Sequence, residues 1–358
     1  MRHLLKILVL GTMVCPRPAQ IPSAVAADLP EFRKLSEGVY AHLVSPDGPF
    51  VSNAGVVVLS QGVLVFDTHF TPEGAEGLLK RIRDVTPRPV LYVALSHFHP
   101  DHTHGAQVFG SASMVLASAN ARRDVLERDV PALNRVIALD QAQVARMSKE
   151  FDRSSDAARR GYLRQQMEER QALLERLSRI HVRVPVAAVE ESLVIADELH
   201  TLQFRVLGPG HTDGDMVLYL PQEKIVFAGD LFFNAALPST DDAQMISWTR
   251  ALEELLKLPA AVFVPGHGPV AGRAEVEHFL QYLRDLRALV EPALGRGEPL
   301  EQVLYETRIP ARYASYGFQN FFPANLTRMY TELRNLQLAA PQAKPEQKKK
   351  KPEGGYND

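Results

Sequence analysis

The sequence contains a single cysteine, Cys15, among its 358 residues, and this cysteine lies in an N-terminal segment with the features of a leader. If the leader is removed, the remaining chain has no thiol. It can then form no disulfide, offer no thiolate to a metal and use no cysteine as a nucleophile. A large charge of either sign is also missing, since 40 basic and 42 acidic residues give a formal net charge of −2. Nothing in this charge predicts nucleic acid as a partner.

Long apolar runs are absent as well. The apolar run in the leader, Ile7–Cys15, is too short to span a bilayer, so we expect no stable membrane insertion. It follows a short basic start and precedes small residues at 24–26, which predicts a signal peptide over residues 1–27 and a periplasmic or secreted protein. Arg17 is the feature that argues against export, and an uncleaved leader would leave the protein cytoplasmic.

The rest of the chain predicts one α/β (α+β) domain over residues 35–340, followed by a disordered basic tail over 341–358. Strand patterns, a hairpin turn at Gln61–Gly62 and a helix capped by Thr71 lead to the apolar run 89–95. This order favours a layered αβ architecture with a site at strand ends.

Residues 119–180 differ from the rest because they are charged and almost free of glycine. Their apolar residues recur at helical spacing, which predicts an insertion of two or three helices. Two roles are open: a lid or flank beside the site, or a solvated insertion with a structural role only. After the insertion, the pattern predicts more strands from Val182 and then helices to about Leu338.

The main chemical feature is the segment 96–105, which follows the apolar run 89–95 and reads SHFHPDHTHG. Imidazole and carboxylate groups are ligands that suit zinc and similar divalent metals. His97 and His99 are two residues apart and can point the same way, while Asp101 and His102 lie beyond a proline that bends the loop. We interpret the segment as a metal site, and its arrangement suits two metals better than one.

Three later segments share one design, in which an apolar strand stops at glycine or proline and then presents one potential ligand. They end at His211, Asp230 and His267. Glycine lets the backbone turn sharply and approach a metal closely. Each segment is weak evidence by itself, but together and in this order they are strong.

These residues resemble the signature of the metallo-β-lactamase superfamily, which is His-x-His-x-Asp-His followed by distant His, Asp and His. The resemblance runs from about Val39 to His267 and implies a four-layer αβ/βα sandwich with two metals at one edge of its sheets. It also implies two Zn²⁺ ions, with Fe or Mn as alternatives. One ion would be held by His97, His99 and His211, the other by Asp101, His102 and His267, with Asp230 bridging both and Asp67 as a supporting residue behind the ligands.

The implied activity is a di-metal hydrolase that cleaves an ester, thioester, lactone or β-lactam bond with a metal-bridging hydroxide. Asp101 would be the catalytic residue that orients the nucleophile and passes on its proton, and the substrate would be a small molecule. A bridging Asp230 resembles the glyoxalase II hydrolases and the lactonases. A β-lactamase proper, a mononuclear iron enzyme resembling the persulfide dioxygenases, and a non-catalytic metal-binding protein are the alternatives.

Several other residues have weaker interpretations. His104 stands where this family commonly has a small residue, and we expect it more often to be a surface histidine than a pocket residue. His69 is more readily a loop histidine than part of the site. We expect Asp213 and Asp215 to be turn and supporting residues. Core packing is the favoured role for six aromatic side chains that could otherwise line a pocket, namely Phe98, Phe232, Phe233, Trp248, Phe321 and Phe322.

Overall fold

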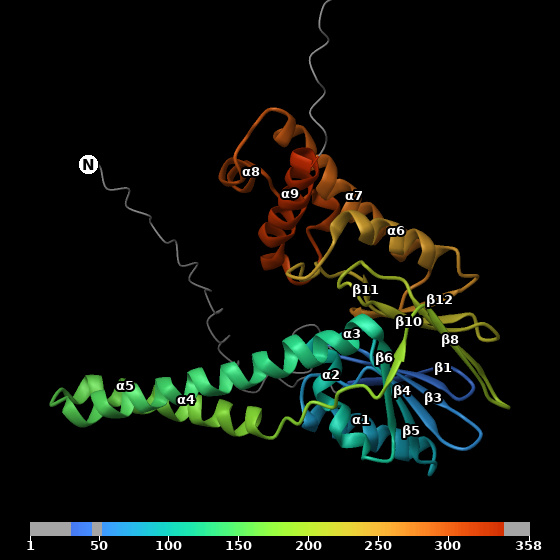
Figure 1. Ribbon diagram of the computed structural model, residues 1–358, viewed down its shortest axis with the longest axis horizontal. Helices are drawn as coiled ribbons and strands as arrows, with labels where there is room; N and C mark the ends of the chain where they lie inside the picture. The colour runs from blue at the N-terminus through green and yellow to red at the C-terminus, as the bar shows by residue number, and fades with distance from the viewer. Residues whose placement is uncertain (1–29, 45–51, 340–358) are drawn as a thin grey trace, which may run out of the picture.

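The computed structural model describes residues 30–44 and 52–339 (Figure 1). The expected signal peptide at 1–27, including Cys15, and the expected tail at 341–358 lie outside the described residues. Within the described ranges, no helix is both long enough and apolar enough to cross a membrane.

The first sheet has seven strands in the order β1 to β7. The first four strands pair antiparallel and the last four pair in parallel. Every residue of β4 is buried, because Val63 and Val65 face the helices while Leu64 and Phe66 face the second sheet. The strands are Glu31–Ser36, Val39–Leu43, Ala54–Val58, Val63–Phe66, Val90–Ala94, Met114–Ser118 and Ala187–Val189.

The second sheet has five strands in the order β12-β11-β10-β9-β8. Its pairs are antiparallel except for β11 and β12, which run in parallel. In sequence order the strands are β8 (Ser192–Ala196), β9 (Thr201–Val206), β10 (Met216–Leu220), β11 (Ile225–Phe233) and β12 (Val262–His267).

Helices cover the outer face of each sheet (Figure 1). Helix α1 (Pro72–Val85) packs on the first sheet and begins as the sequence predicts, with the Thr71 hydroxyl accepting from the backbone N–H of Gly74 and proline at the first position. The second sheet is covered by α6 (Met245–Leu256), α7 (Arg273–Gly295) and α9 (Phe322–Ala339), and the short α8 (Leu300–Glu306) packs against α9.

Three apolar cores fill the spaces between these layers. One lies between the two sheets, one between the first sheet and α1, and one between the second sheet and its helices. The predicted four-layer αβ/βα sandwich with helices after the last strand is therefore confirmed.

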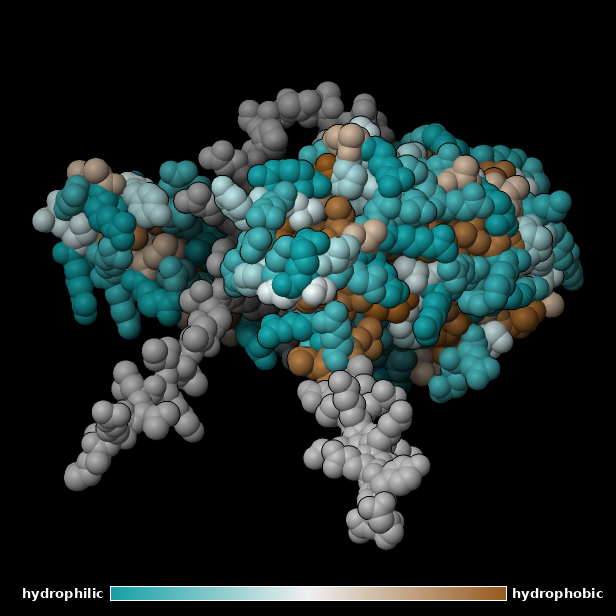
Figure 2. Space-filling view, turned by 90° about the horizontal axis from the view of Figure 1, so that it is seen from above, coloured by the Kyte–Doolittle hydropathy of each residue, from teal (hydrophilic) through white to brown (hydrophobic). Residues whose placement is uncertain are grey.

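The insertion forms a helical hairpin of two long antiparallel helices, α4 (Val130–Arg153) and α5 (Ala157–Ser178), preceded by α3 (Ala119–Asp124) and a π-helical turn, Val125–Asp129. Figure 1 shows the hairpin projecting from the body, and its visible face in Figure 2 is mostly hydrophilic. In α4 only Met147 is buried, and in α5 only Leu163 and Leu177. Most of the hairpin is therefore solvated. Its base, residues 124–135, comprises the end of α3, the π-helical turn and the start of α4, and it contacts the metal-ligand loop, residues 96–105.

Candidate metal centre

Strand β5 of the first sheet and the short helix that follows it present the histidine segment. Strand β5 ends at Ala94, and His97 and His99 lie in the loop that follows it. Pro100 then starts α2 (Pro100–Thr103), a single helical turn that carries Asp101 and His102. Proline fits the first turn of a helix because no intrahelical acceptor is lost there. The loop and the helical turn together therefore hold four potential ligands within six residues.

The second sheet supplies the other three residues. His211 lies in the loop between β9 and β10, Asp230 lies within β11, and His267 is the last residue of β12. Glycines allow the close approach that the sequence suggests. A Cβ atom on Gly266 would lie 1.9 Å from Oδ1 of Asp230, so only glycine fits beside that carboxylate.

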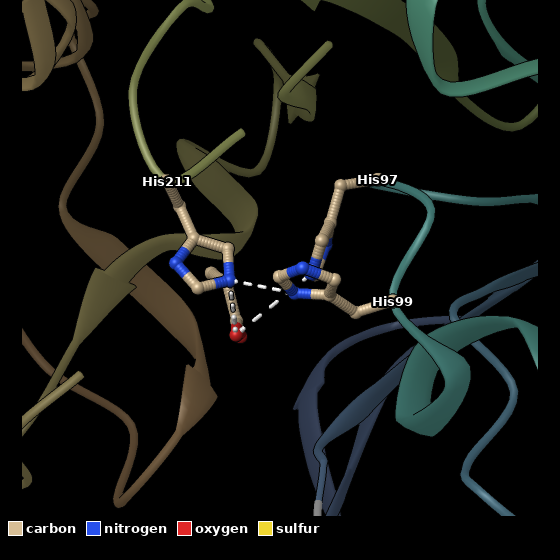
Figure 3. A group of neighbouring side chains, drawn as sticks. His97, His99 and His211 are labelled. Carbon is tan, nitrogen blue, oxygen red and sulfur yellow. Dashed lines mark hydrogen bonds and ion pairs between the residues drawn. The ribbon is translucent and has the colours of Figure 1, made fainter. Parts of the chain in front are cut away.

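The first ligand group consists of His97, His99 and His211, whose rings point toward one another and toward a carboxylate (Figure 3). Nε2 of His211 is 2.9 Å from Nδ1 of His99. Oδ2 of Asp230 is 3.2 Å from Nε2 of His211 and 3.9 Å from Nε2 of His97.

The second ligand group consists of Asp101, His102 and His267. Oδ2 of Asp101 is 3.5 Å from Nε2 of His102 and 3.3 Å from Nε2 of His267. Oδ1 of Asp230 is 3.2 Å from the same nitrogen of each histidine. Asp230 therefore directs one carboxylate oxygen to each group, which is the arrangement a bridging ligand needs.

These spacings fit metal coordination. Ligand atoms at about 2.0–2.1 Å from a tetrahedral zinc lie about 3.3 Å from one another, and the distances above range from 2.9 to 3.9 Å. Among the described residues, Nε2 of His97, Nε2 of His102 and Oδ1 of Asp230 are buried without a hydrogen-bond partner. Unpartnered buried polar atoms are costly, and a cation in each ligand group would together satisfy all three.

Carboxylates and imidazoles lie close enough in the centre to shift one another's pKa. Burial alone would lower the pKa of His267, but Asp230 and Asp101 outweigh it and raise that pKa to about 9. The pKa of His102 is likewise raised well above its ordinary value by Asp230, Asp101 and Asp67 despite burial. Burial lowers the pKa of His211 to about 3. In the absence of metal, protons on the second ligand group therefore balance the carboxylates.

Residues behind the ligands fix their ring orientation. Oδ2 of Asp67 is 2.8 Å from Nδ1 of His102, and its Oδ1 accepts from the backbone N–H of Ser96 at 2.8 Å. On the other side, Oδ2 of Asp242 is 3.0 Å from Nε2 of His99. A carboxylate on the far nitrogen of an imidazole fixes its tautomer and raises its basicity as a ligand. The supporting role predicted for Asp67 agrees with this geometry.

Sequence reasoning missed Asp242. It lies in the segment between β11 and α6, within no recognisable motif, and it meets His99 only through the fold. It also accepts from Arg128, whose guanidinium lies over the Phe98 ring at 4.4 Å from the ring centroid. The only local signal in the sequence is that Asp242 is the second of two consecutive aspartates after Thr240.

His104 is buried, so the expectation of a surface histidine is wrong. Its Nε2 is 3.0 Å from Oδ1 of Asp129, a buried residue at the end of the π-helical turn. The Thr103 hydroxyl donates to the same carboxylate at 3.3 Å. His104 therefore ties the metal-ligand loop to the base of the helical hairpin through Asp129, which lies 25 positions later in the sequence.

His69 is fully buried behind the ligands rather than among them. Its Nε2 is 2.8 Å from Nδ1 of His42, and its Nδ1 faces the Ser52 carbonyl at 2.9 Å. Burial lowers the pKa of His69 to about 3 and that of His42 to about 4. Asp67 and His69 both have left-handed backbone conformations, with φ of 61° and 67°. Such strain at two non-glycine residues is common next to functional sites.

Of the six aromatic side chains expected to pack in the core, five do so and one does not. Phe232, Phe233, Phe322 and Trp248 are buried in the core of the second sheet, and Phe321 packs at its margin, as favoured. Phe98 instead lines a cavity. Asp215 accepts from the backbone N–H and the hydroxyl of Thr212, and burial raises its pKa to about 7. Asp213 lies in the same turn and pairs with Arg123 at 2.5 Å.

Comparison with known proteins agrees with this architecture. The sequence model described as "Metallo-beta-lactamase superfamily" matches residues 47–267, which is more than half of the chain. The chain belongs to this superfamily. The match ends at His267, the last residue of the second ligand group.

Two kinds of superfamily member are similar to the chain. A "Linear primary-alkylsulfatase" from Pseudomonas sp. (strain ATCC 19151) is 23% identical over 267 residues, covering 72% of this chain and 50% of that protein. A "Metallo-beta-lactamase type 2" from Bacteroides fragilis is 32% identical over 103 residues, covering 27% of this chain and 41% of that protein. The chain therefore spans half or less of the length of these relatives.

Solved structures share the fold. A metallo-beta-lactamase from Pontibacter korlensis superposes with a TM-score of 0.53 at 23% identity and covers 71% of this chain and 99% of that one. A double mutant of a sec-alkyl sulfatase superposes with a TM-score of 0.59 at 18% identity and covers 86% of this chain and 50% of that one.

Proposed function

We propose that this member of the superfamily is a two-metal hydrolase that cleaves a carboxylic acid derivative in a small molecule: an ester, a thioester, a lactone or a β-lactam. The observation that carries the proposal is the position of Asp230, with Oδ2 toward the first ligand group and Oδ1 toward the second. A carboxylate placed in this way can join two cations, and zinc suits its imidazole and carboxylate partners.

When bound, such cations lower the pKa of coordinated water to about 7 and polarise an oxygen of the substrate. The protein residues around them hold and orient. Asp67 and Asp242 direct the free nitrogens of His102 and His99 toward the centre. The Ser52 hydroxyl donates to the Asp101 carbonyl and holds that turn in place.

Asp101 is the residue that we assign to proton transfer. In the metal-free protein His102 and His267 keep the pKa of Asp101 below its usual value despite burial. A bound cation would keep the same carboxylate ionised at neutral pH after those rings lose their protons. An ionised carboxylate that faces the reacting atoms can accept a proton from the nucleophile and deliver it to the leaving group. Asp101→Asn should therefore lower kcat by about 10²–10⁴-fold, with a smaller change in KM.

The second ligand group favours two metals over a single iron. The ligand atoms of Asp101, His102 and His267 form a group of their own. In an enzyme with a single metal in the first group, these buried polar atoms would have no cation to bind. Metal analysis of the purified protein should find two ions per chain. One iron per chain with oxygen uptake would contradict the proposal.

A substrate panel tests the scissile bond. Nitrocefin, an acyl-glutathione, an acyl-homoserine lactone and a p-nitrophenyl ester together present a β-lactam, a thioester, a lactone and an ester. We expect hydrolysis of at least one, lost in His97→Ala and in Asp230→Asn. Retention of full activity in either variant would overturn the assignment of the site.

Alkyl sulfate esters are a second candidate class of substrate. Similarity to the alkylsulfatase extends over 72% of this chain, whereas similarity to the Bacteroides fragilis β-lactamase covers 27%. Release of sulfate from octyl sulfate, measured by ion chromatography, with no turnover of the four carboxylic acid derivatives, would move the proposal to this class.

A further inference from the structure

A cavity of about 400 Å³ lies beside the metal centre. Small-molecule sites are typically about 300–1,000 Å³, so this cavity is large enough for part of a ligand. One wall is the metal-ligand loop, represented by Phe98 and Pro100, and the other is the base of the helical hairpin. The hairpin residues are Glu127, Arg128, Asp129, Pro131, Ala132 and Arg135.

Two lining residues, Phe98 and Pro100, are sequence neighbours of the ligands. Phe98 stands between His97 and His99, and Pro100 precedes Asp101. The Phe98 and His99 rings are 4.6 Å apart between centroids. No metal ligand lines the cavity itself, so a substrate whose scissile bond lies at the metal centre would reach the cavity by extending past the His99 ring.

Several contacts form the hairpin wall in advance. Arg128 donates to Asp242, which in turn holds His99, and it also contacts Asp124 at 3.4 Å and the face of Phe98. Asp129 is held by His104. A wall fixed by contacts of this kind loses little conformational entropy when a ligand binds.

The lining selects an uncharged, apolar group. Its two arginines and two acids cancel in formal charge, and Arg128 and Asp129 are already engaged by other side chains. Between these charges the cavity offers the apolar surfaces of two prolines and Ala132, while Phe98 is only 5% exposed and lies under Arg128. A hydrocarbon gains from leaving water for such a surface, whereas an ion would gain no net attraction.

We propose that this cavity binds the hydrocarbon chain of the substrate, an acyl or alkyl group attached to the bond that the metal centre cleaves. The proposal rests on the proposed function for the position of the scissile bond. It assigns chain-length selectivity to the base of the helical hairpin, which gives that part of the insertion a role in recognition.

The test uses the full-length, metal-loaded protein with p-nitrophenyl acetate and p-nitrophenyl octanoate. Ala132→Leu and Ala132→Trp fill the cavity stepwise, and Ala142→Trp, on an exposed part of α4 outside the lining, is the matched control. A buried methylene is worth about fourfold in affinity. We expect Ala132→Trp to lower kcat/KM for the octanoate more than tenfold and for the acetate less than twofold, with Ala132→Leu intermediate and Ala142→Trp unchanged.

A second measurement separates this proposal from the proposed function. Octan-1-ol has the chain but no scissile bond, and its binding can be followed by titration calorimetry whether or not the ester is hydrolysed. We expect Ala132→Trp to weaken octan-1-ol binding more than tenfold relative to Ala142→Trp. Equal binding by the two variants, or an equal loss of acetate and octanoate hydrolysis in Ala132→Trp, would overturn the cavity assignment. Loss of ester hydrolysis alone would count only against the proposed function.

Discussion

At the scale of single residues, the centre depends on carboxylates that lie outside the two ligand groups. Asp67 contacts His102 through one oxygen and the Ser96 backbone N–H through the other, so it joins a ligand to the start of the ligand loop. Asp242 does the same for His99 and Arg128. Each carboxylate orients a ring that would otherwise rotate, and this makes the outer residues as consequential as some ligands.

Asp67→Asn tests this support without changing the backbone. Asparagine tolerates the left-handed conformation of this residue as well as aspartate does. The amide lacks the charge that raises the pKa of His102, so we expect metal affinity or activity to fall about 10–100-fold. Competition with a chromogenic chelator measures the affinity. Asp197→Asn, a carboxylate in the turn between β8 and β9, is the control and should leave affinity unchanged. Equal affinity in both variants would contradict the role of Asp67.

Metal uptake should release protons. In the metal-free protein the pKa of His267 is about 9 and that of His102 is also raised, so both rings are protonated at pH 7. A metal binds only neutral imidazole, and the two protons must leave. We expect about two protons released per chain at pH 7, with affinity rising as pH rises and proton release declining above pH 9. Titration calorimetry in buffers of different ionisation enthalpy counts the protons, and zero release at pH 7 would contradict the prediction.

The seven ligands could be predicted from sequence because each lies in a segment with a local signal. Four lie in the histidine-rich segment after the apolar run 89–95, and three follow an apolar run that reaches glycine or proline. In the structure β11 and β12 continue through these glycines to include Asp230 and His267, so the predicted strand ends there are wrong. The fold places all seven together as the pattern predicts. Asp242 and Asp129 could not be predicted in this way. Their partners are 143 and 25 residues away, and only the folded chain brings them together.

At the scale of elements, the helical hairpin has two parts with different environments. Its base packs against the metal-ligand loop through Asp129 and Arg128. Beyond that base, the two helices are mostly exposed, and Arg170 of α5 pairs with Asp140 of α4. The sequence predicted helices here but left their role open, because spacing shows which residues are helical and not how far a helix stands from the body.

Shortening the helical hairpin tests this division. Residues 141–169 can be replaced by a short glycine-serine loop, since the pairing of Asp140 with Arg170 brings the cut ends together. The removed part buries only Met147 and Leu163. We expect the shortened protein to keep its metal content and its activity within about twofold, with circular dichroism showing a loss of helix alone. Loss of metal or of cooperative unfolding would show that the outer hairpin supports the body.

At the scale of the whole molecule, the metal centre lies where the two sheets meet. The first sheet supplies four ligands through the loop after β5, and the second supplies His211, Asp230 and His267. The core between the sheets already joins them through side chains such as Phe66 and Phe227, whose rings are 6.1 Å apart. The metals would add a polar link at one edge of this interface, where the side chains are charged and apolar packing ends.

Metal removal should therefore destabilise the whole domain and not a single loop. A ligand at about 100 times its Kd stabilises the folded state by about 2.7 kcal/mol. With an unfolding entropy of about 2.1 cal/mol/K per residue over about 300 residues, this corresponds to a decrease in Tm of roughly 4 °C on chelation. Differential scanning calorimetry with EDTA, and again after zinc is restored, measures the shift. His267→Ala, which removes a ligand from the second sheet, should melt near the chelated protein and respond less to EDTA. An EDTA-induced shift confined to a minor early transition, with the main transition unchanged, would place the metals in a locally unfolding loop instead of between the sheets.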